Sequence, residues 1–155
     1  MNTTVAEPRI RPKSFTYHTT LGEVQVEGRT ATLCSAGKPP LWVSSPPEFK
    51  GQKGHWTPED FFVASIEVCL MLTFVGLAEK RGLSFIAYDS SAEGLLEWDG
   101  PSYKFTRVVV TPIITLADEP SFALAREIIA KAHATCLVAN SVRSEVIVNP
   151  IFQRG

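Results

Sequence analysis

Three cysteines are the residues of this chain best suited to redox chemistry: Cys34, Cys69 and Cys136. None belongs to a CxxC or CxxCH motif, so thioredoxin-like and c-type haem chemistry lack their signatures. An odd, widely spaced set is not a structural disulfide framework, and it indicates a reducing compartment. Because free cysteine is among the most buried residue types, each cysteine taken alone is best interpreted as part of the core.

A cysteine that reduces peroxides needs specific surroundings. The nucleophile is the thiolate, and a second thiol must resolve the sulfenic acid before it oxidises further. Burial raises the pKa of a thiol, so a nearby arginine is needed to favour the charged form, and a carboxylate can hold that arginine by a bidentate pair. The set to look for is therefore two cysteines, an arginine, a carboxylate and apolar walls.

A long helix is expected to carry Cys69. Thr57 is suited to the N-cap and Pro58 to the first helical position, and Asp60 follows Thr57 at the capping-box spacing. Gly82 is expected to end the helix. The helix is apolar on nearly every face, which predicts packing on all sides. A small domain cannot easily surround such a helix, so we expect an intimate dimer to supply part of its cover.

The stretch 61–78 is apolar enough to raise the question of a membrane span. Glu67 lies near its middle, where an acidic side chain would cost roughly 3 kcal/mol. The stretch also lies between segments that resemble ordinary strands, so a buried core helix is the better interpretation. No apolar stretch follows the charges near the N-terminus, as a secretory signal would require, and we expect a cytoplasmic protein.

Alternating β-branched and aromatic residues predict strands on both sides of this helix. They cover residues 15–20, 24–27, 29–34 and 41–43 before it, and residues 83–98, 103–116 and 145–148 after it. The Asp99–Gly100 pair is a hairpin signal between two of them. Asp118 and Pro120 predict the start of a second helix, whose apolar residues continue at helical spacing toward Cys136.

The composition favours a single soluble domain. With 155 residues, 45% hydrophobic and 20% charged, the chain can bury a substantial core. We predict one α+β domain over residues 1–155, with residues 1–13 as a flexible N-terminal extension. The formal net charge of −1 gives no broad basic field, so neither nucleic acid nor a membrane surface is an expected partner.

Two segments resemble motifs of one protein family. Residues 54–69, GHWTPEDFFVASIEVC, look like the helix-start-to-cysteine motif of the OsmC/Ohr family, the osmotically inducible protein C and organic hydroperoxide resistance proteins. Residues 131–141, KAHATCLVANS, are similar to its second-cysteine motif, a helix ending in Cys with Asn-Ser shortly after. The resemblance spans roughly residues 15–150, and the predicted order of elements agrees with it.

The resemblance implies a fold and a set of site residues. The fold has antiparallel sheets around two helices, the first of them buried at the interface of an intertwined homodimer with two active sites. Cys69 matches the peroxidatic cysteine and Cys136 the resolving one. Glu59 stands ten positions before Cys69 and matches the glutamate that holds the catalytic arginine. Arg29, which opens an early strand, is the best match to that arginine.

The activity implied by the resemblance is the reduction of organic hydroperoxides to alcohols, with hydrogen peroxide as a second substrate, in defence against oxidative stress. It requires no cofactor and no metal. An external dithiol, either a lipoyl-bearing protein or a small dithiol, would restore the enzyme. Hydroperoxide-specific members carry proline after the second cysteine, whereas this chain carries Leu137, which indicates a divergent member.

Other interpretations remain open from the residues alone. His133 and Cys136, joined by His55 or Cys34, could bind a metal, although structural zinc normally shows close pairs of ligands. A non-catalytic dimer that binds a small apolar ligand, with the cysteines as inert core, is the main alternative. Serine hydrolase chemistry lacks its GxSxG motif. Glu67 is either a buried structural carboxylate, a group facing the dimer partner, or a charge that opposes a Cys69 thiolate.

Overall fold

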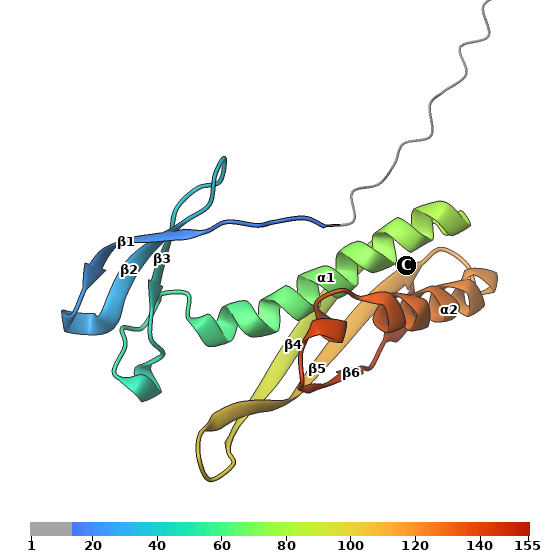
Figure 1. Ribbon diagram of the computed structural model, residues 1–155. Coiled ribbons are helices and arrows are strands. Elements are labelled where there is room, and N and C mark those ends of the chain that lie inside the picture. Colours follow the sequence, from blue (N-terminus) through green and yellow to red (C-terminus); the bar gives the residue numbers. More distant parts are fainter. Residues whose placement is uncertain (1–13) are drawn as a thin grey trace, which may run out of the picture. The chain divides into compact units, whose positions relative to one another are not determined.

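A computed structural model describes residues 14–155 and divides between Trp56 and Thr57 into two compact units (Figure 1). The extension expected at residues 1–13 lies outside the described residues. The two units differ in content, because the first holds a small sheet and the second holds both α-helices and a larger sheet. Whether they act as one domain stays a prediction.

The first unit is built on a three-stranded antiparallel sheet in the order β1-β2-β3. Its strands are β1 (Thr20–Gln25), β2 (Thr30–Cys34) and β3 (Leu41–Ser44), with 3-10 turns η1 (Glu27–Arg29) and η2 (Pro47–Phe49). The predicted strands over 29–34 and 41–43 are confirmed to within a residue at each end.

The start of this sheet differs from the prediction. Residues 15–19 form no strand, and the two strands expected over 15–20 and 24–27 are replaced by β1 alone. Gly22 lies inside β1 and does not end it. The pairing of β1 with β2 shifts register between Gly22 and Gln25, and Glu23 between them has a φ of 52°. A local irregularity, of the kind that glycine in a strand often marks, accommodates Gly22.

The second unit begins with α1 (Pro58–Arg81), whose two ends agree with the prediction. The side chain of Thr57 accepts a hydrogen bond from the Asp60 amide at 3.1 Å, and the Asp60 carboxylate accepts one from the Thr57 amide at 2.9 Å. This reciprocal pair is a capping box. At the other end Gly82 adopts a left-handed conformation with a φ of 68°, which glycine takes without strain.

One face of α1 lies in the core, where Ile66, Leu70, Phe74 and Ala78 are buried. By length and composition α1 could also cross a membrane, and 22% of its apolar stretch is buried within the single chain. The exposed remainder includes Val68 and Leu72. The single chain therefore covers only part of α1, as expected for so small a domain, and the dimer that would complete its cover remains a prediction.

The sheet of this unit is mixed. The long hairpin of β4 (Ala87–Trp98) and β5 (Tyr103–Leu116) is antiparallel, but β6 (Glu145–Val148) and β7 (Ile151–Arg154) both pair with β5 in parallel. The expectation of antiparallel sheets is therefore correct only in part. Strand β7 was not predicted, and β4 starts four residues later than expected because residues 83–86 are not in the sheet.

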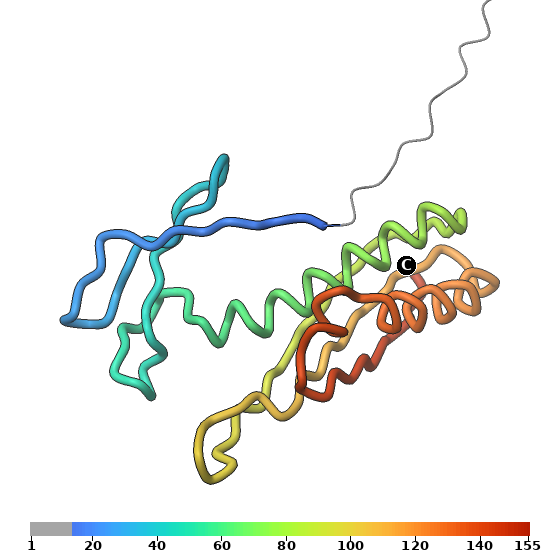
Figure 2. Tube along the Cα trace, viewed as in Figure 1, coloured from blue at the N-terminus to red at the C-terminus, as the bar shows by residue number. Residues whose placement is uncertain are grey.

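The second helix, α2 (Pro120–Thr135), packs with α1 against this sheet. Asp118 accepts a hydrogen bond from the Ser121 amide at 3.0 Å, which supports the predicted capping role, although Glu119 is the residue that directly precedes the helix. After α2 the chain turns into the short 3-10 helix η3 (Ala139–Ser141), which contacts α1. Figure 2 shows this turn, in red, returning alongside the green path of α1.

The capping box generates a prediction about the stability of α1. Replacing Thr57 by Ala removes the side-chain acceptor for the Asp60 amide, so we expect a loss of about 1 kcal/mol in the free energy of unfolding. Thr57→Ser retains the hydroxyl and serves as the matched control, with a change of only a few tenths of that amount. Chemical denaturation measures both, and equal stability of the two variants would contradict a stabilising cap.

Candidate functional site

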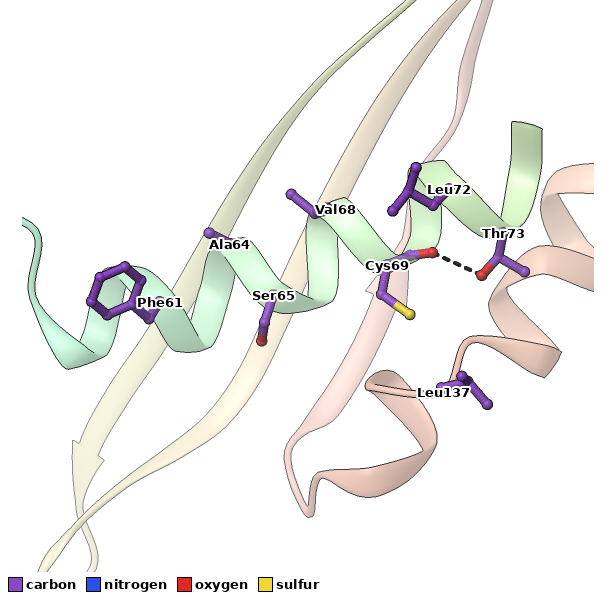
Figure 3. A pocket seen from close by; sticks show the side chains of 8 residues that line it. All are labelled: Phe61, Ala64, Ser65, Val68, Cys69, Leu72, Thr73 and Leu137. Atoms are coloured by element: carbon purple, nitrogen blue, oxygen red, sulfur yellow. Dashed lines mark hydrogen bonds between the residues drawn. The ribbon is translucent and has the colours of Figure 1, made fainter. Parts of the chain in front are cut away.

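Cys69 lies on the half-exposed side of α1, beside the groove shown in Figure 3. Its carbonyl oxygen accepts a hydrogen bond from Thr73 Oγ1 at 2.8 Å, one helical turn further on. The Cys69 sulfur points toward the segment that contains Leu137 (Figure 3). The helix therefore presents this thiol to the chain segment that follows α2.

Cys136 ends α2 and is fully buried, with 0% of its surface exposed. Its backbone leaves the helical conformation, with φ −63° and ψ 117°, so the chain turns away from the α2 axis here. The turn brings the Cys136 thiol within hydrogen-bonding reach of the Cys69 thiol. The fold thus brings together the two cysteines that the sequence paired.

The surroundings of Cys69 favour its thiolate. Burial is the largest single influence and raises the pKa of the Cys69 thiol. Four polar groups oppose it and lower the pKa: in order of size, the Val138 amide, the Cys136 thiol, the Leu137 amide and the Thr73 hydroxyl. Together they outweigh burial, so the pKa of Cys69 lies below its ordinary value.

The pKa of Cys136 moves in the other direction. Burial raises the pKa of the Cys136 thiol most, the Ala139 amide opposes it, the hydrogen bond and negative charge of Cys69 raise it further, and the Val138 amide opposes it least. Cys69 is therefore the thiol that ionises first, while Cys136 remains protonated and can donate to it. This asymmetry is what an attacking and a resolving cysteine require.

An apolar groove of about 650 Å³ lies beside Cys69. Seven other residues line it: Phe61, Ala64, Ser65, Val68, Leu72, Thr73 and Leu137. None of these is charged, and the hydroxyls of Ser65 and Thr73 are their only side-chain polar groups. Leu137 is 78% exposed and lies across from the α1 side chains (Figure 3). The groove therefore suits a ligand with an alkyl or aryl body.

Glu59 lies in the first turn of α1 but takes no part in the capping box, which Thr57 and Asp60 complete. Its Oε2 atom is buried and has no hydrogen-bond partner among the described residues. A buried carboxylate oxygen without a donor is costly. Glu59 is therefore suited to receive a cationic or polar group, as its predicted role requires.

Arg29 belongs to the first unit and is exposed. It follows Gly28 in a turn where both residues are left-handed, with φ 75° for Gly28 and 50° for Arg29. Its Nη1 donates a hydrogen bond to the Phe49 carbonyl at 2.8 Å. Left-handed backbone is uncommon for arginine and often occurs at functional positions. The role of Arg29 beside the thiolate remains a prediction.

Glu67 has a structural partner on the sheet. Its carboxylate accepts a hydrogen bond from Ser90 Oγ on β4 at 2.5 Å. Burial, and then the negative charge of Glu67, raise the pKa of the neighbouring Tyr88 to about 12. The groups that set the pKa of Cys69 do not include Glu67. Of the three interpretations given for Glu67, the structural carboxylate is the one that a hydrogen bond supports.

The remaining candidates are Cys34 and the set proposed to bind a metal. Cys34 lies on β2 in the first unit, opposite Thr20 of β1. Among residues 14–155, no three His, Cys, Asp or Glu side chains are gathered as a metal site would need, and this includes His133 and His55. The donor set that the metal hypothesis requires is therefore not assembled in this part of the chain.

The second unit is an α+β fold with two helices. Its long apolar helix α1 presents the Cys69 thiol to the Cys136 thiol at the end of α2. Residues 51–150 match the protein family described as OsmC-like protein. The chain therefore belongs to the OsmC-like family, and α1 is the core helix of this fold. Proteins of this family are typically dimers.

Similar proteins and structures come from several bacteria. The Bacillus subtilis "Uncharacterized protein YmaD" is 21% identical over 107 residues, which cover 67% of this chain and 71% of that protein. An OsmC-like protein of unknown function from Vibrio cholerae has a TM-score of 0.78 at 22% identity, covering 89% of this chain and all of that one.

Two other similar structures carry names that refer to hydroperoxides. An organic hydroperoxide resistance protein from Elizabethkingia anophelis has a TM-score of 0.72 at 18% identity, covering 94% of this chain and 100% of that one. OhrB, the organic hydroperoxide resistance protein of Bacillus subtilis, has a TM-score of 0.61 at 21% identity, covering 89% and 98%. The family thus includes hydroperoxide resistance proteins, and these likenesses show the shared fold.

Sequence reasoning missed three groups that act on Cys69. Thr73 carries a detectable signal, because it stands four residues after Cys69 and therefore on the same face of the helix. The backbone amides of Leu137 and Val138 carry none, because every residue other than proline has such a group and only the fold aims it.

The opposite pKa shifts of the two thiols generate a prediction about alkylation. A thiol reacts as its thiolate, so the rate of each cysteine rises with pH and levels off above its pKa. Cys69 should therefore reach its plateau at a lower pH than Cys136. Iodoacetamide labelling across a pH series, followed by peptide mass spectrometry on the Cys34→Ser protein, measures both curves. Earlier labelling of Cys136 would contradict the assignment.

Proposed function

We propose that this protein is a thiol-dependent peroxidase that reduces organic hydroperoxides to alcohols through Cys69 and Cys136. One observation carries the proposal: the Cys69 thiol, with its pKa lowered, is hydrogen bonded to the buried Cys136 thiol at the edge of an apolar groove. A nucleophile, a resolving thiol and a place for the organic part of the substrate are thus combined within one unit.

The first step is attack by the Cys69 thiolate on the terminal oxygen of the hydroperoxide. The O–O bond breaks, an S–O bond forms, and the alkoxide leaves and takes a proton to become the alcohol. The sulfur is oxidised by two electrons to a sulfenic acid. Attack at the sulfenic sulfur by Cys136 then forms the disulfide and releases water. An external dithiol, a lipoyl-bearing protein or a small dithiol, reduces the disulfide and becomes a disulfide itself.

The lining of the groove supports an organic substrate. The side chains of Phe61, Val68, Leu72 and Leu137 offer apolar surface next to the Cys69 sulfur. Burial of an alkyl or aryl group there contributes about 25 cal/mol for each Å² removed from water. Hydrogen peroxide has no such group, so it is the poorer of the two substrates.

Glu59 and Arg29 have supporting roles in this proposal. The unpartnered Glu59 oxygen is suited to hold a guanidinium, and Arg29 is the arginine proposed to stabilise the charge of the Cys69 thiolate. The left-handed backbone at Arg29 is consistent with a side chain held in one required direction. A positive charge near the sulfur would add to the effect of the hydrogen bonds already described.

The active form in this proposal is a homodimer in the cytoplasm. Val68 and Leu72 on α1 are 49% and 60% exposed in the single chain, and a second copy of the chain would cover them. The sequence has three widely spaced cysteines and no disulfide framework, which is usual for a protein of a reducing compartment. The groove beside Cys69 would then be closed in part by the partner subunit.

A non-catalytic module that binds a small apolar ligand is the second candidate. The same groove favours it, because its size suits a small ligand and its lining is apolar. In that case the two thiols would be inert core residues and would not react with hydroperoxides. The reactivity of Cys69 separates the two functions.

Treatment with one equivalent of cumene hydroperoxide provides the main test. We expect rapid formation of a Cys69–Cys136 disulfide, with Cys34 still free, because the two thiols are already in contact. Cys69→Ser should abolish turnover, whereas Cys136→Ser should allow one oxidation and then stop. Disulfide mapping by mass spectrometry and a peroxide-consumption assay measure these outcomes.

Cys34→Ser is the matched control, and its turnover should equal that of the unmodified protein. Full peroxide consumption by the Cys69→Ser variant would exclude the proposed mechanism. Three unreacted thiols in folded, unmodified protein would instead favour the ligand-binding module.

The unpartnered carboxylate generates a separate prediction. Glu59→Gln keeps the size of the side chain but removes its charge, so it should weaken the hold on the arginine and slow the oxidation of Cys69. We expect a loss of roughly tenfold to a hundredfold in rate, the range of a few kcal/mol that charged hydrogen bonds contribute. Asp60→Asn, in the same turn, is the control and should mainly affect stability. A Glu59→Gln protein that loses stability but oxidises at the original rate would reduce Glu59 to a structural role.

A further inference from the structure

The residues after Cys136 include a pair, Asn140 and Ser141, that the proposed reaction does not use. Both take part in a small network of hydrogen bonds around the turn between α2 and η3. The Asn140 side chain donates to the Ala134 carbonyl at 3.1 Å, and its amide donates to the Cys136 carbonyl at 3.0 Å. Ser141 Oγ donates to the Leu137 carbonyl at 2.7 Å. These bonds connect Asn140 and Ser141 to Ala134 in the last helical turn of α2 and to the Cys136 and Leu137 carbonyls that follow it.

The turn that these bonds hold carries three of the four groups that donate to Cys69. They are the Cys136 thiol and the amides of Leu137 and Val138. A hydrogen bond weakens steeply when its length or angle departs from the preferred geometry. A small displacement of the backbone of residues 136–138 would therefore weaken the hydrogen bonds that lower the pKa of Cys69.

Packing holds only part of this turn. Cys136 is buried and Val138 and Ala139 pack against the core, whereas Leu137 is 78% exposed and Asn140 and Ser141 are exposed as well. The bond from Asn140 Nδ2 to Ala134 reaches back past Cys136 into α2. It therefore joins the two ends of the segment that contains Cys136, Leu137 and Val138.

We propose that Asn140 is a positioning residue that holds the Cys136–Val138 turn against Cys69 by tying it to the last turn of α2. This inference rests on the proposed function, since it concerns the same pair of thiols. Asn140 touches neither sulfur through its side chain. It acts on the first oxidation by keeping the two amides aimed at the Cys69 sulfur, and on disulfide formation by keeping the Cys136 thiol beside it.

A simpler role for Asn140 would be to satisfy a carbonyl at the end of α2, as helix C-caps do. Such a cap would contribute to stability and leave the chemistry of Cys69 unchanged. The two roles can be separated, because only a positioning role alters the protonation of Cys69 and the rate at which its sulfenic acid is resolved.

The test compares Asn140→Ala with Thr135→Ala in the full chain. Thr135 Oγ1 donates to the Lys131 carbonyl at 2.8 Å, so its substitution removes a side-chain bond to a carbonyl of α2 without touching the turn. For Asn140→Ala we expect the pH midpoint of Cys69 alkylation by iodoacetamide to rise. The alkylation rate at pH 6 should fall roughly twofold to tenfold, which corresponds to the loss of about one hydrogen bond. Thr135→Ala should keep the original profile.

A second readout follows the sulfenic acid after one equivalent of cumene hydroperoxide. Dimedone should trap more Cys69 sulfenic acid in Asn140→Ala than in Thr135→Ala, because the disulfide closes more slowly. If Asn140→Ala fails to fold, Ser141→Ala gives the same comparison with a smaller effect, since it removes the bond to Leu137. An unchanged alkylation profile in the folded variant would overturn the proposal. Alkylation requires no peroxide, so this result is independent of whether the protein proves to be a peroxidase.

Discussion

The hydrogen bond between the thiols of Cys69 and Cys136 is the interaction on which the candidate site depends. It exists because α1 and the end of α2 pack against the same sheet, which places the turn after α2 beside the middle of α1. The core residues Ile66 and Leu70 on one side of α1, and Ala132 of α2, fix this arrangement. The chemistry of the site is thus a result of how two helices share one core.

Neutral dipoles and the partial burial of Cys69 set the balance between its thiol and thiolate forms. Burial acts against the charged sulfur, and the amides of Leu137 and Val138 with the Thr73 hydroxyl act in its favour. Such groups are fixed by the backbone or by a helical turn, so they need little reorganisation when charge appears. An arginine held by Glu59 would add a full charge to an environment that already favours the thiolate.

Parts of this molecule follow directly from local sequence signals. The ends of α1 were predictable because Thr57, Pro58 and Gly82 each have a specific stereochemical role at a helix terminus. Strand β7 and the parallel pairing of β6 were not, since parallel pairing depends on contacts between distant segments and leaves no turn signal.

For the site, the resemblance of two motifs to those of one family pointed to Cys69 and Cys136, and it pointed to Glu59 through its place ten positions before Cys69. The donors from the turn after α2 could not be found in this way, because an amide becomes a specific donor only through the fold. The group that Arg29 contacts in an active protein likewise depends on tertiary and subunit packing, which local sequence patterns do not encode.

The complete burial of Cys136 has a consequence for the return half of the cycle. In the oxidised protein an incoming dithiol would reach the sulfur of Cys69, which borders the groove, and Cys136 would be the leaving group. Burial, the largest cause of the raised pKa of the Cys136 thiol, would make it depart slowly in such an exchange. Recovery would then be the slow half of the cycle, and the fraction of protein held in the oxidised form would report the supply of reducing equivalents in the cell.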